Sequence, residues 1–274
     1  MAMRAVGASS PAWLAENVAC DLALPEGADP EAAIVLLRQA IAPHPLDVVV
    51  QPRAGRRKTF LIADMDSTMI DQECIDELAA EAGLKEHVAG ITARAMNGEI
   101  AFEPALRERV ALLTGLSLEI VEKVLAERIT LASGGAELVR TMKRDGAWTA
   151  LVSGGFSLFT RAIAARLGFD EDRANTLLAD SGRLTGEVAE PILGRAAKAE
   201  ALNEIAARLA IGPEAVMAVG DGANDLDMLR LAGAGVALHA KPAVAAQARH
   251  RIDHGDLTAL LYMQGYARSE FAET

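Results

Sequence analysis

The chain has 274 residues, which is enough for one large domain or two small ones. Hydrophobic residues make up 51% of it and aromatic residues only 4%, so the core must be mainly aliphatic, as is typical of layered α/β proteins. The net charge of −11 argues against broad binding of nucleic acids or anionic membranes, because both need a basic face. An acidic protein that handles an anion would need a local positive site, such as a bound metal ion.

The number of cysteines and the length of the apolar runs indicate the cellular compartment of the protein. Cys20 and Cys74 are too few for a disulfide framework, so both are predicted to be reduced thiols. No apolar run approaches the length of a membrane span, and the first residues lack a signal-peptide pattern. We therefore expect a cytoplasmic protein with no nucleic-acid partner and no membrane partner.

The first 52 residues are predicted to form a small N-terminal α+β unit. ACDLALP (19–25) and LDVVVQP (46–52) have the composition of strands, and EAAIVLLRQAIA (31–42) has helical spacing. The basic stretch RAGRRK (53–58) is interpreted as a solvated linker, in preference to an anion-binding patch.

The rest of the chain is predicted to be an α/β core interrupted by a helical insertion. TFLIAD (59–64) is a buried-type strand, whereas residues 73–127 carry apolar residues at helical spacing with no strand between them. Strands and helices alternate afterwards, which predicts a Rossmann-like, mostly parallel sheet formed by 53–72 and 128–274. The predicted helices are 73–84, 86–98, 102–115, 117–128, 136–146, 156–168, 195–212 and 224–233. The predicted strands are 59–64, 148–155 and 214–222, a strand and hairpin at 174–188, and short edge strands at 235–238 and 251–253.

Polar residues gather in the loops that follow three of these strands. In a parallel α/β sheet the ligand site lies beyond the carboxyl ends of the strands, so these loops should share one crevice. Carboxylates without histidine or cysteine suit a hard cation such as Mg²⁺, which binds oxygen and leaves room for water and phosphate. The residues concerned are Asp64, Asp66, Ser153, Gly154, Gly155, Asp221, Asn224 and Asp225.

The same crevice has the parts of a phosphoryl site. The SGG turn (153–155) precedes a helix, so its amides and the helix N-terminus would bind an anion, and Lys198 could reach the crevice from the next long helix. One aspartate could attack phosphorus and another could transfer protons, but the residues alone do not say which does which. The alternative is that these acids and glycines are plain turn residues.

The motifs resemble those of a known superfamily. DMDST (64–68), SGG, Lys198 and GDGAND (220–225) are similar, in order and spacing, to the four motifs of the haloacid dehalogenase superfamily. Two longer stretches, 64–79 and 96–113, resemble its phosphoserine phosphatases. The resemblance implies Mg²⁺-dependent hydrolysis of O-phosphoserine to serine and phosphate through a phosphoaspartyl intermediate, the last step of serine biosynthesis. The alternative is a related phosphatase or phosphotransferase acting on another small phosphorylated metabolite.

The resemblance also implies the roles of the central residues. Asp64 would be the nucleophile and Asp66 the general acid and base. Mg²⁺ would be held by the Asp64 carboxylate, the Asp66 backbone carbonyl and Asp221. Lys198 would neutralise charge on Asp64 and on the phosphoryl group.

Four further residues would support the phosphoryl group and the metal. By resemblance, Ser153 and Gly154 would bind the phosphoryl oxygens and Asn224 would support that site. Asp225 would orient Lys198 and the water shell of the metal.

The helical insertion would supply the recognition of the amino acid. By resemblance, Glu73 would bind the substrate ammonium and Arg109 its carboxylate, while Met96 and Phe102 would shield the pocket. The alternatives are that Glu73 is a plain helix-start acid and that Met96 and Phe102 are ordinary core residues. For the arginine, Arg107, Arg94 and Arg128 are the competing candidates. Residues 73–127 would then be a cap that closes over the substrate.

Residues 1–52 have no predicted ligand. Some superfamily members carry regulatory domains that bind amino acids at this end, and this unit could be a reduced form of one. It could also be the surface of a homodimer or a packing element.

Overall fold

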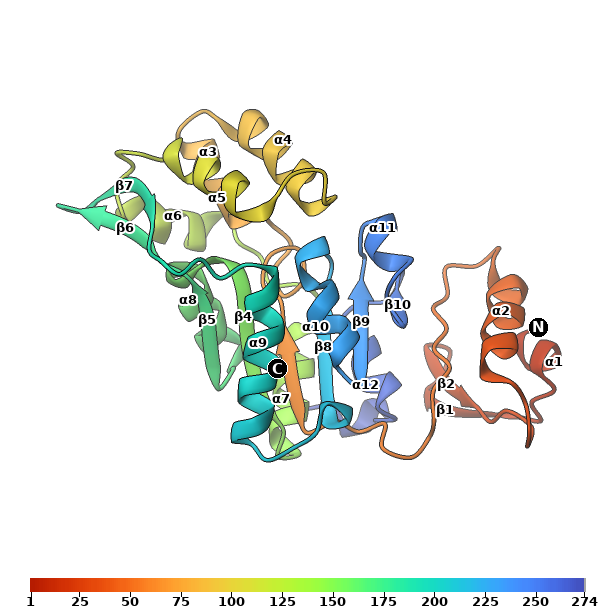
Figure 1. The fold of residues 1–274 in the computed structure, drawn as a ribbon. Coiled ribbons are helices and arrows are strands. Elements are labelled where there is room, and N and C mark those ends of the chain that lie inside the picture. The colour runs from red at the N-terminus through yellow and green to blue at the C-terminus, as the bar shows by residue number, and fades with distance from the viewer. Residues whose placement is uncertain (274) are drawn as a thin grey trace.

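A computed structural model of the protein describes residues 1–273, apart from the side chain of Met96, so the prediction for that side chain lies outside the described residues. At its centre is a six-stranded sheet in the order β10-β9-β8-β3-β4-β5 (Figure 1). Every neighbouring pair in this sheet is parallel, as the sequence predicts. The strands are β3 (Phe60–Ala63), β4 (Trp148–Phe156), β5 (Glu171–Asn175), β8 (Val216–Gly220), β9 (Ala234–Leu238) and β10 (His250–Ile252).

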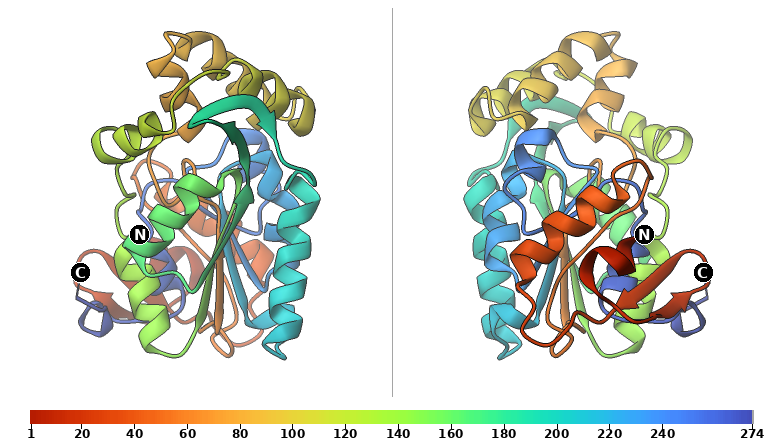
Figure 2. Two further views of the ribbon diagram at one scale, coloured as in Figure 1. Left: turned by 90° about the vertical axis from the view of Figure 1, so that its left-hand side faces the viewer. Right: turned by 90° about the vertical axis from the view of Figure 1, so that its right-hand side faces the viewer.

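Both faces of the sheet are covered by helices (Figure 2). Phe60 and Ile62 of the central strand belong to the apolar cluster formed with α9 and α10. Leu61 and Ala63 alternate to the opposite face and join the cluster formed with α7, α8 and α12. The helices are α7 (Gly135–Arg144), α8 (Ser157–Leu167), α9 (Arg195–Arg208), α10 (Leu226–Leu231), α11 (Pro242–Ala245) and α12 (Ala259–Met263).

The predicted helical insertion forms all four of its helices. They lie over the carboxyl ends of the strands (Figures 1 and 2). Each helix buries one side, for example Leu78 and Leu106, which are 0% and 2% exposed. The four helices are α3 (Cys74–Glu81), α4 (Lys85–Met96), α5 (Phe102–Ala111) and α6 (Glu119–Glu127).

The predicted hairpin is confirmed as β6 (Leu177–Asp180) and β7 (Arg183–Val188). It does not belong to the main sheet. Instead its second strand packs against α5, and Leu184 exchanges backbone hydrogen bonds with Gly115 and Leu116, each 2.8 Å long. The hairpin is therefore fastened to the helical insertion, which its sequence gives no sign of.

The prediction of a strand at 46–52 is wrong. This segment is extended but forms no strand ladder. Val48 and Val50 pack into the small N-terminal apolar cluster, whereas Val49 packs against the main core. Asp47 accepts backbone hydrogen bonds from Asp253 and Gly255, both 2.7 Å long. The apolar run at 48–50 thus reflects packing between two parts of the protein.

Three smaller differences concern strands. A strand at residues 11–15 is not predicted by the sequence, and it pairs antiparallel with the predicted strand near residue 20. β5 overlaps only the first two residues of the stretch predicted as a strand and hairpin. β9 lies inside the sheet, so only β10 of the two predicted edge strands is at the edge. The N-terminal elements are α1 (Ala2–Val6), β1 (Pro11–Ala15), β2 (Ala19–Leu22) and α2 (Pro30–Ile41).

Within residues 1–273, no helix is both long enough and apolar enough to cross a membrane.

Candidate active site

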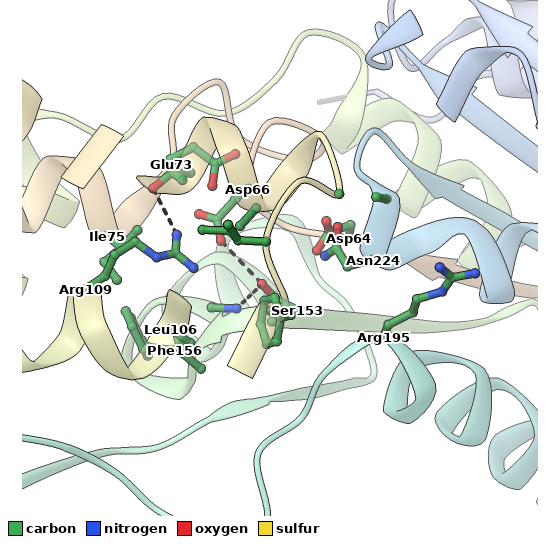
Figure 3. A pocket seen from close by; sticks show the side chains of 18 residues that line it. Asp64, Asp66, Glu73, Ile75, Leu106, Arg109, Ser153, Phe156, Arg195 and Asn224 are labelled. Atoms are coloured by element: carbon green, nitrogen blue, oxygen red, sulfur yellow. Dashed lines mark hydrogen bonds between the residues drawn. The ribbon is translucent and has the colours of Figure 1, made fainter. Parts of the chain in front are cut away.

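The loops that follow β3 and β8 and the last residues of β4 meet beneath the helical insertion. These three strands are neighbours in the sheet, so their carboxyl ends open on the same edge. A cavity of about 310 Å³ lies there (Figure 3). The sequence-predicted residues that line it are Asp64, Asp66, Glu73, Phe102, Arg109, Ser153, Gly154 and Asn224.

Lys198 lies just beyond the cavity lining, in the first turns of α9, with its amino group between two carboxylates. Its Nζ is 2.7 Å from Asp64 Oδ1 and 2.6 Å from Asp225 Oδ1, and the Lys198 side chain is 0% exposed. Burial alone would lower the pKa of Lys198, but Asp225 and Asp64 outweigh burial and raise it. Asp225 is held in turn by the Gly222 N–H, which donates to Oδ2 at 2.9 Å. Lys198 therefore supplies a fixed positive charge.

Three buried carboxylates form a group that could hold a metal ion. Oxygens of Asp64, Asp221 and Asp225 lie within 4.8 Å of one another. Burial and Asp225 raise the pKa of Asp64 to about 7, and burial followed by Asp225 and Asp64 raises that of Asp221 well above its usual range. A hard divalent cation with oxygen ligands would favour the ionised forms, so this donor set fits such an ion.

Asp66 has a different environment from Asp64. Its Oδ1 accepts the Cys74 N–H at 2.9 Å, and its Oδ2 is 3.4 Å from the Ser153 hydroxyl, which donates. Burial raises the pKa of Asp66, and these hydrogen bonds oppose the rise. A Cβ at residue 155 would lie 2.7 Å from Asp66 Oδ2, so Gly155 leaves room for this carboxylate. The Asp66 carboxylate is thus occupied by partners of its own, and its backbone carbonyl as a metal ligand stays a prediction.

The SGG stretch (153–155) forms the last part of β4 rather than a turn after it, and it lies directly under the insertion. The Gly155 N–H donates to Ser153 Oγ at 2.9 Å, and the Asn175 amide donates to the Gly154 carbonyl at 2.8 Å. The Phe102 ring lies so close that a Cβ at residue 154 would be 2.8 Å from it. Phe102 thus covers the end of β4, and residue 154 must be glycine for the ring to fit there.

Glu73 and Arg109 lie together on one side of the cavity, with Asn224 and Arg195 toward the other side (Figure 3). Glu73 immediately precedes α3 and accepts the Ser67 hydroxyl at 2.6 Å. Burial, followed by the charge of Asp66, raises the pKa of Glu73 to about 8. A cation bound beside Glu73 would lower this pKa again.

Arg109 is the buried arginine of α5. It is 5% exposed, and burial lowers its pKa while Glu73 and Asp76 oppose this. Arg107 on the same helix is exposed and pairs with Glu190, so of these two arginines Arg109 faces the cavity.

Several cavity residues are not predicted by the sequence. Ile75 and Leu106 carry no signal beyond the helical apolar spacing that any core residue has. Arg195 is predicted only to lie in a helix; its Nε is 2.6 Å from Oδ2 of Asp227, an acid with no predicted role. The unpredicted lining residues are Ile75, Thr92, Ala95, Gly98, Ile100, Leu106, Phe156, Arg195 and Ala223.

Comparison with known proteins gives consistent relatives. The pattern of the haloacid dehalogenase-like hydrolase family matches residues 61–230. A phosphoserine phosphatase of Archaeoglobus fulgidus is 46% identical over 217 residues, which cover 78% of this chain and 63% of that protein. One of Methanocaldococcus jannaschii is 42% identical over 206 residues, which cover 75% of this chain and 97% of that protein.

A solved structure has the same fold. It is described as a phospho-aspartyl intermediate analogue of phosphoserine phosphatase, and it matches with a TM-score of 0.72 and 42% identity. The match covers 75% of this chain and 98% of that chain. Phosphatases of this family generally use a divalent metal, with which the buried carboxylate group agrees. The chain belongs to the haloacid dehalogenase-like hydrolases and, among them, to the phosphoserine phosphatase family.

Proposed function

We propose that the protein hydrolyses O-phosphoserine to serine and phosphate with a bound Mg²⁺ ion. The observation that carries this proposal is the division of one cavity into two ends. Asp64 lies at one end beside Lys198, and Glu73 and Arg109 lie at the other. The substrate has a matching layout, because its phosphate is separated by a short carbon chain from an ammonium and a carboxylate.

In the proposed reaction, the Asp64 carboxylate attacks phosphorus and forms a phosphoaspartyl bond as the bond to the serine oxygen breaks. Asp66 donates a proton to the departing oxygen and then takes one from the water that hydrolyses the intermediate. Its raised pKa supports this double role, since a protonated carboxyl is needed first. Lys198 stabilises the charge on Asp64 and the phosphoryl group.

The remaining groups would hold the phosphoryl oxygens. Ser153, Gly154 and Asn224 line that end of the cavity and offer hydroxyl, backbone and amide donors. Mg²⁺, held by Asp64, Asp221 and the Asp66 carbonyl, would neutralise further charge there. Phe102 covers the glycines at the end of β4 and would exclude water from them.

Arg109→Ala tests the amino-acid end of the cavity. We expect kcat/KM for phosphoserine to fall about 100-fold, because a charged hydrogen bond to the substrate carboxylate is lost. Phosphoethanolamine has the ammonium but no carboxylate, so its kcat/KM should change much less. Phosphate release from both substrates measures the difference.

The matched control is Arg107→Ala, two residues earlier on α5, whose side chain is half-exposed and pairs with Glu190. It should leave both substrates nearly unchanged. Equal losses on phosphoserine and phosphoethanolamine in Arg109→Ala would remove Arg109 from carboxylate recognition.

The proposal includes three broader points. The enzyme would act in the cytoplasm and catalyse the last step of serine biosynthesis. A second copy of the chain could bind it to form a homodimer. Its parts would be an N-terminal unit (1–52), a core (53–72 and 128–274) and a cap (73–127). The exposed Trp13 and Val18 of the N-terminal unit, 53% and 69% exposed, are compatible with a dimer surface.

A further inference from the structure

We infer that Thr92, held by Asp76, is a positioning residue that fixes the Arg109 guanidinium for the carboxylate of the substrate. This inference rests on the proposed function, because it presupposes that Arg109 binds that carboxylate. It adds two residues, neither of which the sequence singles out, to the recognition of the amino acid.

The three side chains form a chain of hydrogen bonds across the cap. Thr92 Oγ1 is 2.7 Å from Asp76 Oδ1 and 2.9 Å from Arg109 Nη1. A hydroxyl has one proton, and the Val88 carbonyl competes for it at 3.1 Å. The Asp76 carboxylate is nearer and charged, so it takes the proton and leaves an oxygen lone pair of Thr92 for Arg109.

This arrangement fixes the direction of the guanidinium. Arg109 Nε donates to the Ala105 carbonyl at 3.0 Å, so two of its three nitrogens are tied to protein. Among the described residues, Arg109 Nη2 has no hydrogen-bond partner. Every fully buried side-chain nitrogen or oxygen in residues 1–273 does have one. Nη2 is therefore not fully buried, and because Arg109 lines the cavity this nitrogen is available there. The free edge of the guanidinium is the part that a carboxylate would meet.

The hydrogen bonds between Asp76, Thr92 and Arg109 also join three helices of the cap. Asp76 is on α3, Thr92 on α4 and Arg109 on α5. Thr92 is 3% exposed and itself lines the cavity, so it has little contact with bulk water. A purely structural role would stabilise the cap and affect every substrate alike, whereas a positioning role affects only substrates that carry a carboxylate.

The test compares Thr92→Val, which keeps the shape but removes the hydroxyl, with Thr92→Ser, which keeps the hydroxyl. For Thr92→Val we expect KM for phosphoserine to rise about tenfold, with kcat within about twofold of the starting protein. KM for phosphoethanolamine should stay within about twofold, and Thr92→Ser should restore phosphoserine binding. Thermal unfolding of each variant is followed in parallel.

Asp76→Asn is the second variant, because it alters the same set of hydrogen bonds even if Thr92→Val fails to fold. It keeps a hydrogen-bond acceptor but removes the charge, so it should raise KM for phosphoserine by a smaller factor and again spare phosphoethanolamine. Equal changes on both substrates, or an unchanged KM for phosphoserine in Thr92→Val, would overturn the inference.

Arg109→Ala separates this inference from the proposed function. If Arg109→Ala weakens phosphoserine selectively but Thr92→Val and Asp76→Asn do not, the inference fails and the proposed function stands. If Arg109→Ala has no selective effect, carboxylate recognition by Arg109 fails, and the positioning role fails with it.

Discussion

Asp64→Asn is expected to reduce turnover of phosphoserine by a factor on the order of 10⁴ or more while the protein stays folded. The amide cannot attack phosphorus, so no phosphoaspartyl bond forms. The fold should survive because the oxygen of the introduced amide can still accept the Met65 N–H, which donates to Asp64 at 2.8 Å. Lys198 also keeps Asp225 as a partner at 2.6 Å. Phosphate release and circular dichroism measure the two parts of this expectation.

Asp71→Asn is the matched control, because Asp71 is an exposed acid a few residues along the same loop. Its carboxylate accepts a hydrogen bond from Thr130 and does not line the cavity. Asp71→Asn should keep nearly full activity. Substantial turnover by Asp64→Asn would refute Asp64 as the nucleophile.

Lys198→Met is expected to abolish turnover and also to lower the free energy of unfolding by about 3–5 kcal/mol. Within residues 1–273, Lys198 is the only cationic side chain at salt-bridge distance from Asp64 or Asp225, and both carboxylates are buried. The methionine fills a similar volume, so the loss comes from charge rather than from a cavity. Urea unfolding at pH 7 with a chelator present measures the loss without a contribution from metal.

Lys143→Met controls for the removal of a lysine. Lys143 pairs with Asp170 at 2.7 Å, but its side chain is 34% exposed, so this pair should contribute only about 0–1 kcal/mol. If Lys198→Met and Lys143→Met lowered the free energy of unfolding equally, the buried ion pairs of Lys198 would stabilise the protein no more than an exposed pair does.

The placement of the core residues could be predicted from sequence for a physical reason. A run such as TFLIAD followed by acids indicates a buried strand ending at a polar loop, and parallel strands open on one edge. This brings Asp64, Ser153 and Asp221 together without knowledge of side-chain packing. The reach of Lys198 follows from its place near the start of a helix that returns to that edge.

The features that could not be predicted depend on packing between elements. Arg107 and Arg109 are two residues apart on one helix, and only its contacts decide that Arg109 turns inward. Residues 48–50 have the apolar composition of a strand, but they are apolar because they pack against two different clusters. The position of a polar residue within a helix, such as Thr92 in α4, gives no sign of its partners on two other helices.

The most direct test of the proposed activity is phosphate release from a small panel of phosphorylated metabolites, with Mg²⁺ and then with excess chelator. The panel contains L-phosphoserine, phosphothreonine, phosphoethanolamine and a sugar phosphate. The proposal predicts release mainly from phosphoserine and its loss on chelation, because Asp64 and Asp221 need the cation and Glu73 and Arg109 select the amino acid. Release mainly from the sugar phosphate, or release that persists in excess chelator, would contradict it.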